Sequence, residues 1–168
     1  MDEKTLVRRA SGGDKEAFAA LYMRYRDDLY RYAYFRLGNE EDARDAVSAC
    51  IVEVYESIFG LRNASAFKAW IFRILYRCCC RLMTEQNQSR NNRADAEELH
   101  NVPAGNEHIS PEVKEAFGVL NTCDRDIVLL SVIGGYSSFE IADMTGLKPS
   151  TVRSRLKRAL AKMRQFLE

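Results

Sequence analysis

The sequence predicts an all-α protein built of two small helical domains joined by a flexible linker, the second of them a helix-turn-helix domain. Its 168 residues contain only three Pro and nine Gly. Apolar residues recur at steps of three and four through long segments, which is the period of an α-helix. A polar stretch of roughly 25 residues, 86–110, interrupts this pattern and is too long for a loop inside one compact domain. We therefore expect an N-terminal domain at 1–85 and a C-terminal domain at 111–168.

Composition excludes several classes of protein. The formal net charge is only +1, from 25 Lys and Arg against 24 Asp and Glu, which excludes a uniformly basic nucleic-acid coat protein. No apolar run is long enough to predict a membrane span, and the first residues lack the layout of a signal peptide. We therefore expect a cytoplasmic protein whose five Cys are reduced thiols.

Four helices are predicted in the N-terminal domain. The first spans about 3–11 and stops at a pair of glycines. The second begins after Asp14, a good N-cap, and ends at Gly38, which suits the left-handed position that follows a helix. Asn39 caps a third helix, whose first turn is acidic, as the positive end of the helix dipole favours. After a short loop, the fourth helix spans about 66–85.

The C-terminal domain is expected to hold four more helices. Ser110, followed by proline at the first helical position, starts a helix that reaches about residue 120. Asp124 begins the next helix, and its apolar residues include Val132. A short helix at 138–145, a turn, and a last helix opened by Pro149 complete the domain.

The last two of these helices have the spacing of a helix-turn-helix. Gly146 supplies the positive φ that the tight turn needs, and Ala142 lets the second helix approach closely. The N-terminal half of the second helix enters the major groove in such motifs, where Arg can bond a guanine edge with two donors. The alternative is an ordinary surface helix rich in Lys and Arg. The predicted DNA-binding residues are Ser150, Thr151, Arg153, Ser154, Lys157 and Arg158.

Charge is segregated along the chain, because an acidic block precedes each of two basic blocks, at 61–93 and 144–168. Such blocks often mark only solvated faces. In the fourth helix, however, arginines alternate with aromatic residues on the side expected to face outward. Single-stranded DNA suits this pattern, because bases stack on rings and the backbone meets positive charge. We expect Trp70 to be partly buried, so that it braces this surface.

Three segments, in order along nearly the whole chain, resemble the small extracytoplasmic-function (ECF) type of bacterial RNA polymerase sigma factor. Glu41–Val47 is similar to the acidic start of the helix that binds core polymerase, and Phe67–Ile74 is similar to the promoter-opening segment. Leu120–Arg158 is similar to the helix-turn-helix of the family. The three motifs together are far more specific than the last one alone, which other regulators share.

The resemblance implies a sigma factor that directs RNA polymerase core to specific promoters and assists promoter melting. An acidic helix would dock on the clamp helices of the largest polymerase subunit, through Asp42, Asp45, Ser48 and Glu53. The fourth helix and the loop at 60–65 would capture a flipped base of the minus-ten element, through Lys68, Trp70, Phe72, Arg73 and Arg77. The C-terminal domain would read the minus-thirty-five element, and the linker would cross the polymerase channel. Members of the family are commonly held inactive by an anti-sigma factor.

Two other classes of protein remain as alternatives. One is a stand-alone helix-turn-helix regulator that binds duplex DNA without polymerase, although the acidic third helix argues against it. The other is a thiol enzyme or metal site at Cys78–Cys80, with His100 and His108 in the linker. Consecutive helical residues point about 100° apart, so these thiols cannot share one metal ion. We therefore expect no catalytic residue, metal, cofactor or small-molecule substrate. Cys50, Cys78 and Cys123 are expected in the core, and Cys79 and Cys80 are expected to be partly exposed and oxidisable.

Overall fold

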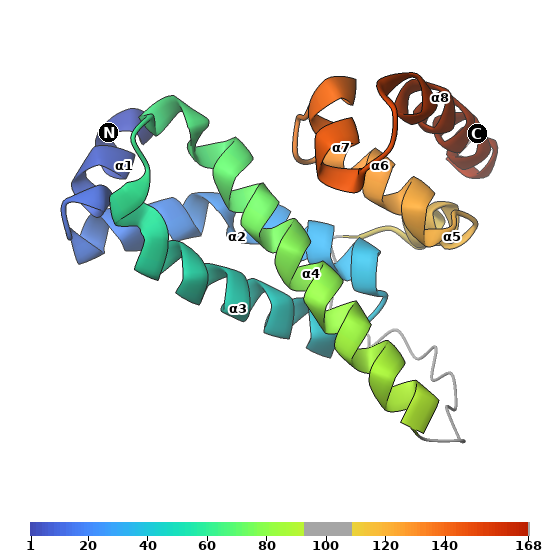
Figure 1. Ribbon diagram of the computed structural model, residues 1–168, viewed down its shortest axis with the longest axis horizontal. Coiled ribbons are helices and arrows are strands. Elements are labelled where there is room, and N and C mark those ends of the chain that lie inside the picture. The colour runs from blue at the N-terminus through green and yellow to red at the C-terminus, as the bar shows by residue number, and fades with distance from the viewer. Residues whose placement is uncertain (93–108, 168) are drawn as a thin grey trace. The chain divides into compact units, whose positions relative to one another are not determined.

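The computed structural model describes residues 1–92 and 109–167, and within them the side chains of 1–86 and 109–167. These residues form eight α-helices and two short 3-10 helices, and no strand occurs among them. The chain divides into two compact units, Met1–His100 and Asn101–Glu168 (Figure 1). The predicted all-α class and two helical domains are confirmed. Most of the predicted linker, 93–108, lies outside the described residues.

In the first unit, α2, α3 and α4 pack against one another and α1 packs on α2 (Figure 1). The elements are α1 (Glu3–Ser11), α2 (Lys15–Leu37), α3 (Glu40–Ser57), η1 (Ile58–Gly60), η2 (Ala64–Ala66) and α4 (Phe67–Asn92). The carboxylate of Asp14 accepts from two backbone N–H groups of α2, and the side chain of Asn39 accepts from the backbone N–H of Asp42. Gly38 adopts φ 86° and ends α2. Polar caps and one left-handed glycine thus set the helix boundaries, as predicted.

Helix α4 is longer than predicted. It ends at Asn92 instead of near residue 85, and its C-terminal end extends beyond the junction of α2 and α3 (Figure 1). Neither Gly nor Pro occurs between 86 and 92, so nothing in the backbone stops the helix there. The side chain of Gln86 also donates to the carboxylate of Asp42 at the start of α3. That contact joins α4 at Gln86 to the start of α3.

The second unit contains four helices: α5 (Pro111–Gly118), α6 (Thr122–Val132), α7 (Ser138–Thr145) and α8 (Pro149–Leu167). Helix α8 packs against each of the other three. The core of this unit is a cluster of apolar side chains from α5, α6 and α8 and the α5–α6 turn: Ala116, Leu120, Val128, Ala159 and Met163. These contacts give the unit a small core of its own.

The start of α6 differs from the prediction. Helix α6 begins at Thr122, because the side chain of Asn121 accepts from the backbone N–H of Asp124 and acts as the N-cap. Asp124 therefore lies in the first turn, where its charge suits the helix dipole. Val132, one of the apolar residues of this helix, is 65% exposed at its C-terminal end. Among the described residues, no helix has the length and apolarity to cross a membrane.

Candidate functional site

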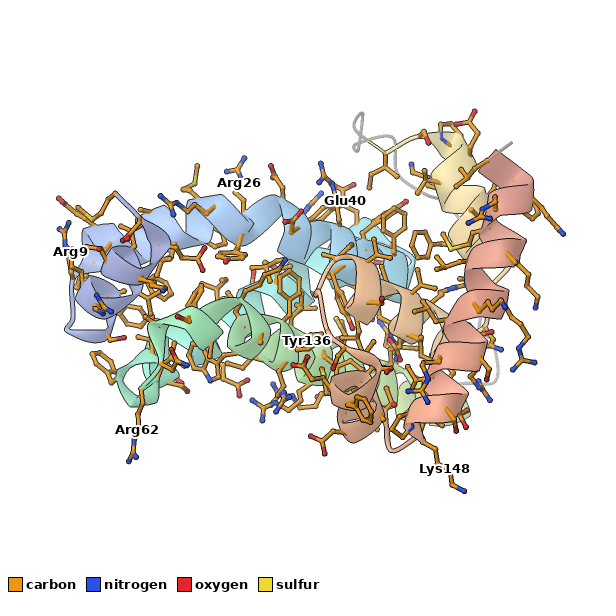
Figure 2. The ribbon with its side chains drawn as sticks, turned by 90° about the horizontal axis from the view of Figure 1, so that it is seen from above. Arg9, Arg26, Glu40, Arg62, Tyr136 and Lys148 are labelled. Atoms are coloured by element: carbon orange, nitrogen blue, oxygen red, sulfur yellow. The ribbon has the colours of Figure 1, made fainter. Side chains whose placement is uncertain are left out.

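The helix-turn-helix forms at the predicted residues. Ser137 and Glu140 make a reciprocal capping box at the start of α7. Gly146 adopts φ 77° after α7, and its N–H donates to the carbonyl of Ala142. Ile141, Ala142 and Val152 are buried, so they pack α7 and α8 together. Lys148, in the turn between the two helices, points away from the ribbon (Figure 2).

Most of the predicted DNA-binding residues of α8 share one exposed face. They recur at steps of three and four, which places them on one side of a helix. Thr151 is half-buried, whereas the other five are exposed: Ser150, Arg153, Ser154, Lys157 and Arg158. The hydroxyl of Ser154 donates to the carbonyl of Thr151, and Nε of Arg158 donates to the carbonyl of Ser154. The face therefore presents three cations close to the N-terminal half of the helix.

One arginine of the motif, Arg155, does not belong to this face. It is half-buried, and its Nη1 lies 3.5 Å from the carboxylate of Asp124 in the first turn of α6. This ion pair joins α8 to α6. Arg155 therefore has a structural partner inside the unit, whereas Arg153 and Arg158 project outward.

Phe139 is a residue of this region that the sequence analysis missed. It lies in the first turn of α7 and is 69% exposed. Its ring lies under the guanidinium carbon of Arg153, 5.9 Å from the ring centroid. The only signal in the sequence is an aromatic residue at a position of the first helix that does not face the core.

The outward surface of α4 carries the predicted basic residues, but one aromatic residue was placed wrongly. Lys68, Arg73 and Arg77 are exposed, and Trp70 is half-buried as predicted. The prediction that Phe72 faces outward is wrong: it is 0% exposed and lies edge-on to Tyr32, with centroids 6.1 Å apart. The apolar stripe of α4 that faces the bundle is wide enough to include this position.

The predicted polymerase-binding residues of α3 differ in their surroundings. Asp45 and Ser48 are exposed. Asp42 is half-buried and accepts from Nδ2 of Asn39 at 2.6 Å. Glu53 is also half-buried, and its two oxygens lie 3.5 Å from Arg77 and 3.0 Å from Arg81. Part of the acidic block therefore pairs with the basic block within the unit.

A groove of about 460 Å³ separates α3 from α4 on this side. Its walls carry acidic groups from both helices, together with one guanidinium and one thiol. The residues with charged or thiol side chains are Asp45, Glu53, Glu56, Cys78, Arg81 and Glu85. Two of the predicted polymerase-binding residues, Asp45 and Glu53, line this groove, whereas none of the predicted minus-ten-binding residues does.

All five cysteines are free thiols. Cys50 and Cys78 are buried and Cys80 is half-buried, as predicted. Two predictions are wrong: Cys79, expected to be partly exposed, is buried, and Cys123, expected in the core, is only half-buried. Burial raises the pKa of the Cys50 and Cys78 thiols above the ordinary value. Among the described residues, no group of three metal-ligating side chains comes together. His100 and His108 lie outside the described residues.

Comparison with known proteins gives a consistent family. Residues 21–89 match Sigma-70 region 2, and residues 111–163 match Sigma-70 region 4. The chain is 30% identical to the RNA polymerase sigma factor SigV of Bacillus subtilis, over 83% of this chain and 84% of the relative. It is 29% identical to the ECF RNA polymerase sigma-E factor of Haemophilus influenzae, over 95% of this chain and 92% of the relative.

Two solved structures share the fold of this chain. CnrH, in complex with the cytosolic domain of CnrY, matches with a TM-score of 0.67 at 26% identity, over 98% of this chain and 96% of that chain. The sigma factor RpoE of Bartonella quintana, in complex with the anti-sigma factor NepR, has the same fold, with a TM-score of 0.73 at 21% identity, over 89% of this chain and 96% of that chain.

The helix-turn-helix and the matches to both regions define an RNA polymerase sigma factor, the class of protein that directs core polymerase to promoters. The chain belongs to the sigma-70 family, and within it to the extracytoplasmic-function type. This result favours a sigma factor over a stand-alone regulator.

Proposed function

We propose that the two units divide promoter recognition between them. The N-terminal unit docks on core polymerase and binds the melted minus-ten element, while the C-terminal unit reads the minus-thirty-five element as duplex DNA. The observation that carries this proposal is the exposed basic face of α8, held by a helix-turn-helix whose turn glycine has a positive φ of 77°. Domain roles follow the predicted boundaries, with 1–85 and 111–168 joined by a linker at 86–110.

For the minus-thirty-five element, we assign base reading to the N-terminal half of α8. Arg153 is exposed there, and a guanidinium can bond two acceptors of a guanine edge in the major groove. Lys157 and Arg158, one turn further along, suit phosphate contacts, which fix the position of the protein without reading sequence. Ser150, Thr151 and Ser154 add hydroxyl groups to the same region of the helix.

For the minus-ten element, we assign the outward surface of α4 and the loop before it. Lys68, Arg73 and Arg77 are exposed cations that suit the backbone of a single strand. Trp70 is half-buried, so part of its ring remains available for a base to stack on. Phe72 supports this surface from inside the bundle, because its ring is buried against α2.

For polymerase, we assign the exposed face of α3 to the clamp helices of the largest subunit. Asp45 and Ser48 are exposed at the centre of this face. Asp42 and Glu53 border this face and bind side chains of α4, Gln86 and the arginines Arg77 and Arg81, so they anchor α4 beside it. A negative face meeting a positive one accelerates association and selects the partner.

We propose an anti-sigma factor as a further protein partner. CnrH was solved with the cytosolic domain of CnrY, and RpoE with the anti-sigma factor NepR, which supports this partner class. Binding energy, with no covalent chemistry, is proposed to drive promoter melting. We therefore assign no catalytic residue, cofactor or small-molecule substrate, and we place the protein in the cytoplasm with the polymerase.

The proposal is tested by transcription with core polymerase and this protein on a library of genomic fragments. We expect start sites that share one pair of minus-thirty-five and minus-ten motifs, and no such transcripts from core polymerase alone. Binding of core polymerase is measured in parallel by pull-down. If the protein fails to bind core polymerase yet still binds duplex DNA, the stand-alone regulator is the better account.

A further inference from the structure

The inference concerns how α7 holds the guanidinium of Arg153. Two groups from the first turn of α7 meet it: Nη1 of Arg153 donates to the hydroxyl of Ser138 at 3.4 Å, and the ring of Phe139 lies 5.9 Å from the guanidinium carbon. Both residues belong to the first helix of the motif, whereas Arg153 belongs to the second. The arginine is therefore held from outside its own helix.

Phe139 has no evident role in holding the fold together. Its side chain is 69% exposed, whereas the neighbouring Ile141 and Ala142 are buried and pack α7 on the core. The start of α7 is stabilised by the capping box of Ser137 and Glu140, which does not involve the ring. An exposed aromatic ring in this place therefore calls for another explanation than packing.

Restricting an arginine before it binds has a physical advantage. A free arginine on a helix surface samples many rotamers, and binding DNA in one of them costs conformational entropy. A ring face attracts a guanidinium through its quadrupole, and the hydroxyl adds a directional contact. Together they reduce the ordering that remains when the guanidinium meets a base.

We propose that Phe139, with Ser138, is a positioning residue for Arg153, so that base preference in the minus-thirty-five element depends on both helices of the motif. This inference rests on the proposed role of Arg153 in reading that element. The recognised group is the acceptor edge of a guanine in duplex DNA, which a planar guanidinium matches in only a narrow range of orientations.

The test measures base preference with the complete holoenzyme, assembled from core polymerase and the full-length chain. A set of promoters, which together carry each of the four bases at each position of the minus-thirty-five element, competes for binding. Phe139→Leu removes the ring but keeps an apolar side chain, and Phe139→Tyr keeps the ring. Phe166→Leu is the matched control. Phe166 is also an exposed phenylalanine, and it lies in the last turn of α8, the helix that carries Arg153.

We expect Arg153→Ala to lower the preference at one base position by about tenfold or more. Phe139→Leu should lower the preference at the same position by about two- to fivefold, while Phe139→Tyr and Phe166→Leu leave it unchanged. In the double variant with Arg153→Ala, Phe139→Leu should have no further effect. The salt dependence of binding should stay the same, because Phe139 is uncharged and its loss removes no phosphate contact.

Four results would overturn the inference. If Arg153→Ala relaxes the preference and Phe139→Leu does not, the ring has no positioning role, although the proposed function stands. If the effect of Phe139→Leu persists without Arg153, the ring acts on DNA directly. If Phe139→Leu weakens binding equally at every sequence, it does not act on base reading. If Arg153→Ala itself leaves the preference unchanged, the assigned role of Arg153 fails first, and the inference fails with it.

Discussion

Glu53 holds two arginines of α4 with one carboxylate, and this arrangement shows what a surface ion pair does in this protein. The side chains of Arg77 and Arg81 are 57% and 61% exposed, so water screens both pairs and each contributes at most about 1 kcal/mol. The pairs therefore orient the guanidinium groups more than they stabilise the fold. A DNA phosphate can take the place of Glu53 beside Arg77 at small cost.

Phe72 is expected to act on stability and only through stability on promoter opening. Truncating a fully buried phenylalanine leaves a cavity, so Phe72→Ala should lower the free energy of unfolding by about 3–5 kcal/mol. Phe72→Leu, which fills most of the space, should cost less. Urea unfolding followed by circular dichroism measures both, with the exposed Lys68→Ala as a control. Loss of promoter opening in Phe72→Leu at unchanged stability would show that the ring touches DNA.

The cysteines are expected to fall into two classes of reactivity. Burial raises the pKa of Cys50 and Cys78, so these thiols stay protonated at neutral pH and are also shielded from reagents. Cys80 and Cys123, which are half-buried, should be alkylated first in the native protein. Mass spectrometry after alkylation at pH 7 to 8, with and without urea, checks this order. Early labelling of Cys50 would contradict the burial of the α3–α4 contact.

At the scale of elements, the boundaries of the helices follow from a few residues. Gly38 and Gly146 take positive φ directly after α2 and α7, and Asp14 and Asn39 are the N-caps of α2 and α3. Such signals are local, so they were predictable from the sequence. The end of α4 was not predicted, because residues 86–92 are all polar and carry no apolar helix pattern, although no Gly or Pro interrupts them.

The turn of the helix-turn-helix allows a clean test of backbone strain. A Cβ added at Gly146 meets no atom within 4 Å, so the only expected cost of Gly146→Ala is the backbone strain of an L-residue at φ 77°. We expect a loss of about 1–2 kcal/mol in the stability of the C-terminal unit. Gly118→Ala is the control, since it also meets no atom but does not require a positive φ. There the change should be neutral or stabilising, because Ala favours a helix. Thermal unfolding of the C-terminal unit, which contains both glycines, distinguishes the two variants.

At the scale of the whole molecule, the sequence predicted two domains because each carries its own set of helices with apolar stripes. It predicted the exposed basic faces because Arg and Lys recur there at helical spacing. It could not predict that Phe72 faces inward, since the width of the buried stripe on α4 depends on how α2 covers it. It also did not show that Phe139, fourteen residues before Arg153 in the chain, lies beside it, since that contact depends on how α7 packs against α8.

Because the two units have separate cores, their functions should separate by substitution. Asp45→Lys reverses a charge on the exposed face of α3 and should weaken binding to core polymerase, with no change in duplex binding by the C-terminal unit. Arg153→Ala should weaken duplex binding, with no change in binding to core polymerase. The double variant should show both losses, each as large as in the single variant, since the sites share no partners. Pull-down with core polymerase and gel-shift titration measure the two activities. The control is Asp27→Lys, an equally large charge change on a side chain of α2 that is 76% exposed.

A parallel loss of both activities in Asp45→Lys would indicate misfolding instead of a damaged docking face. Circular dichroism of each variant settles that point. A loss of duplex binding in Asp45→Lys with native helix content would contradict the division of labour between the units.

The unexpected length of α4 also limits how far the chain can reach. Each residue of a helix advances the chain by about 1.5 Å, against about 3.4 Å for an extended strand. Because the segment 86–92 is helical, it spans less than half the distance that the same residues would cover if extended. The tether between the two proposed DNA-binding surfaces is shorter by that difference, so promoters with long spacers between their two elements are expected to be used poorly.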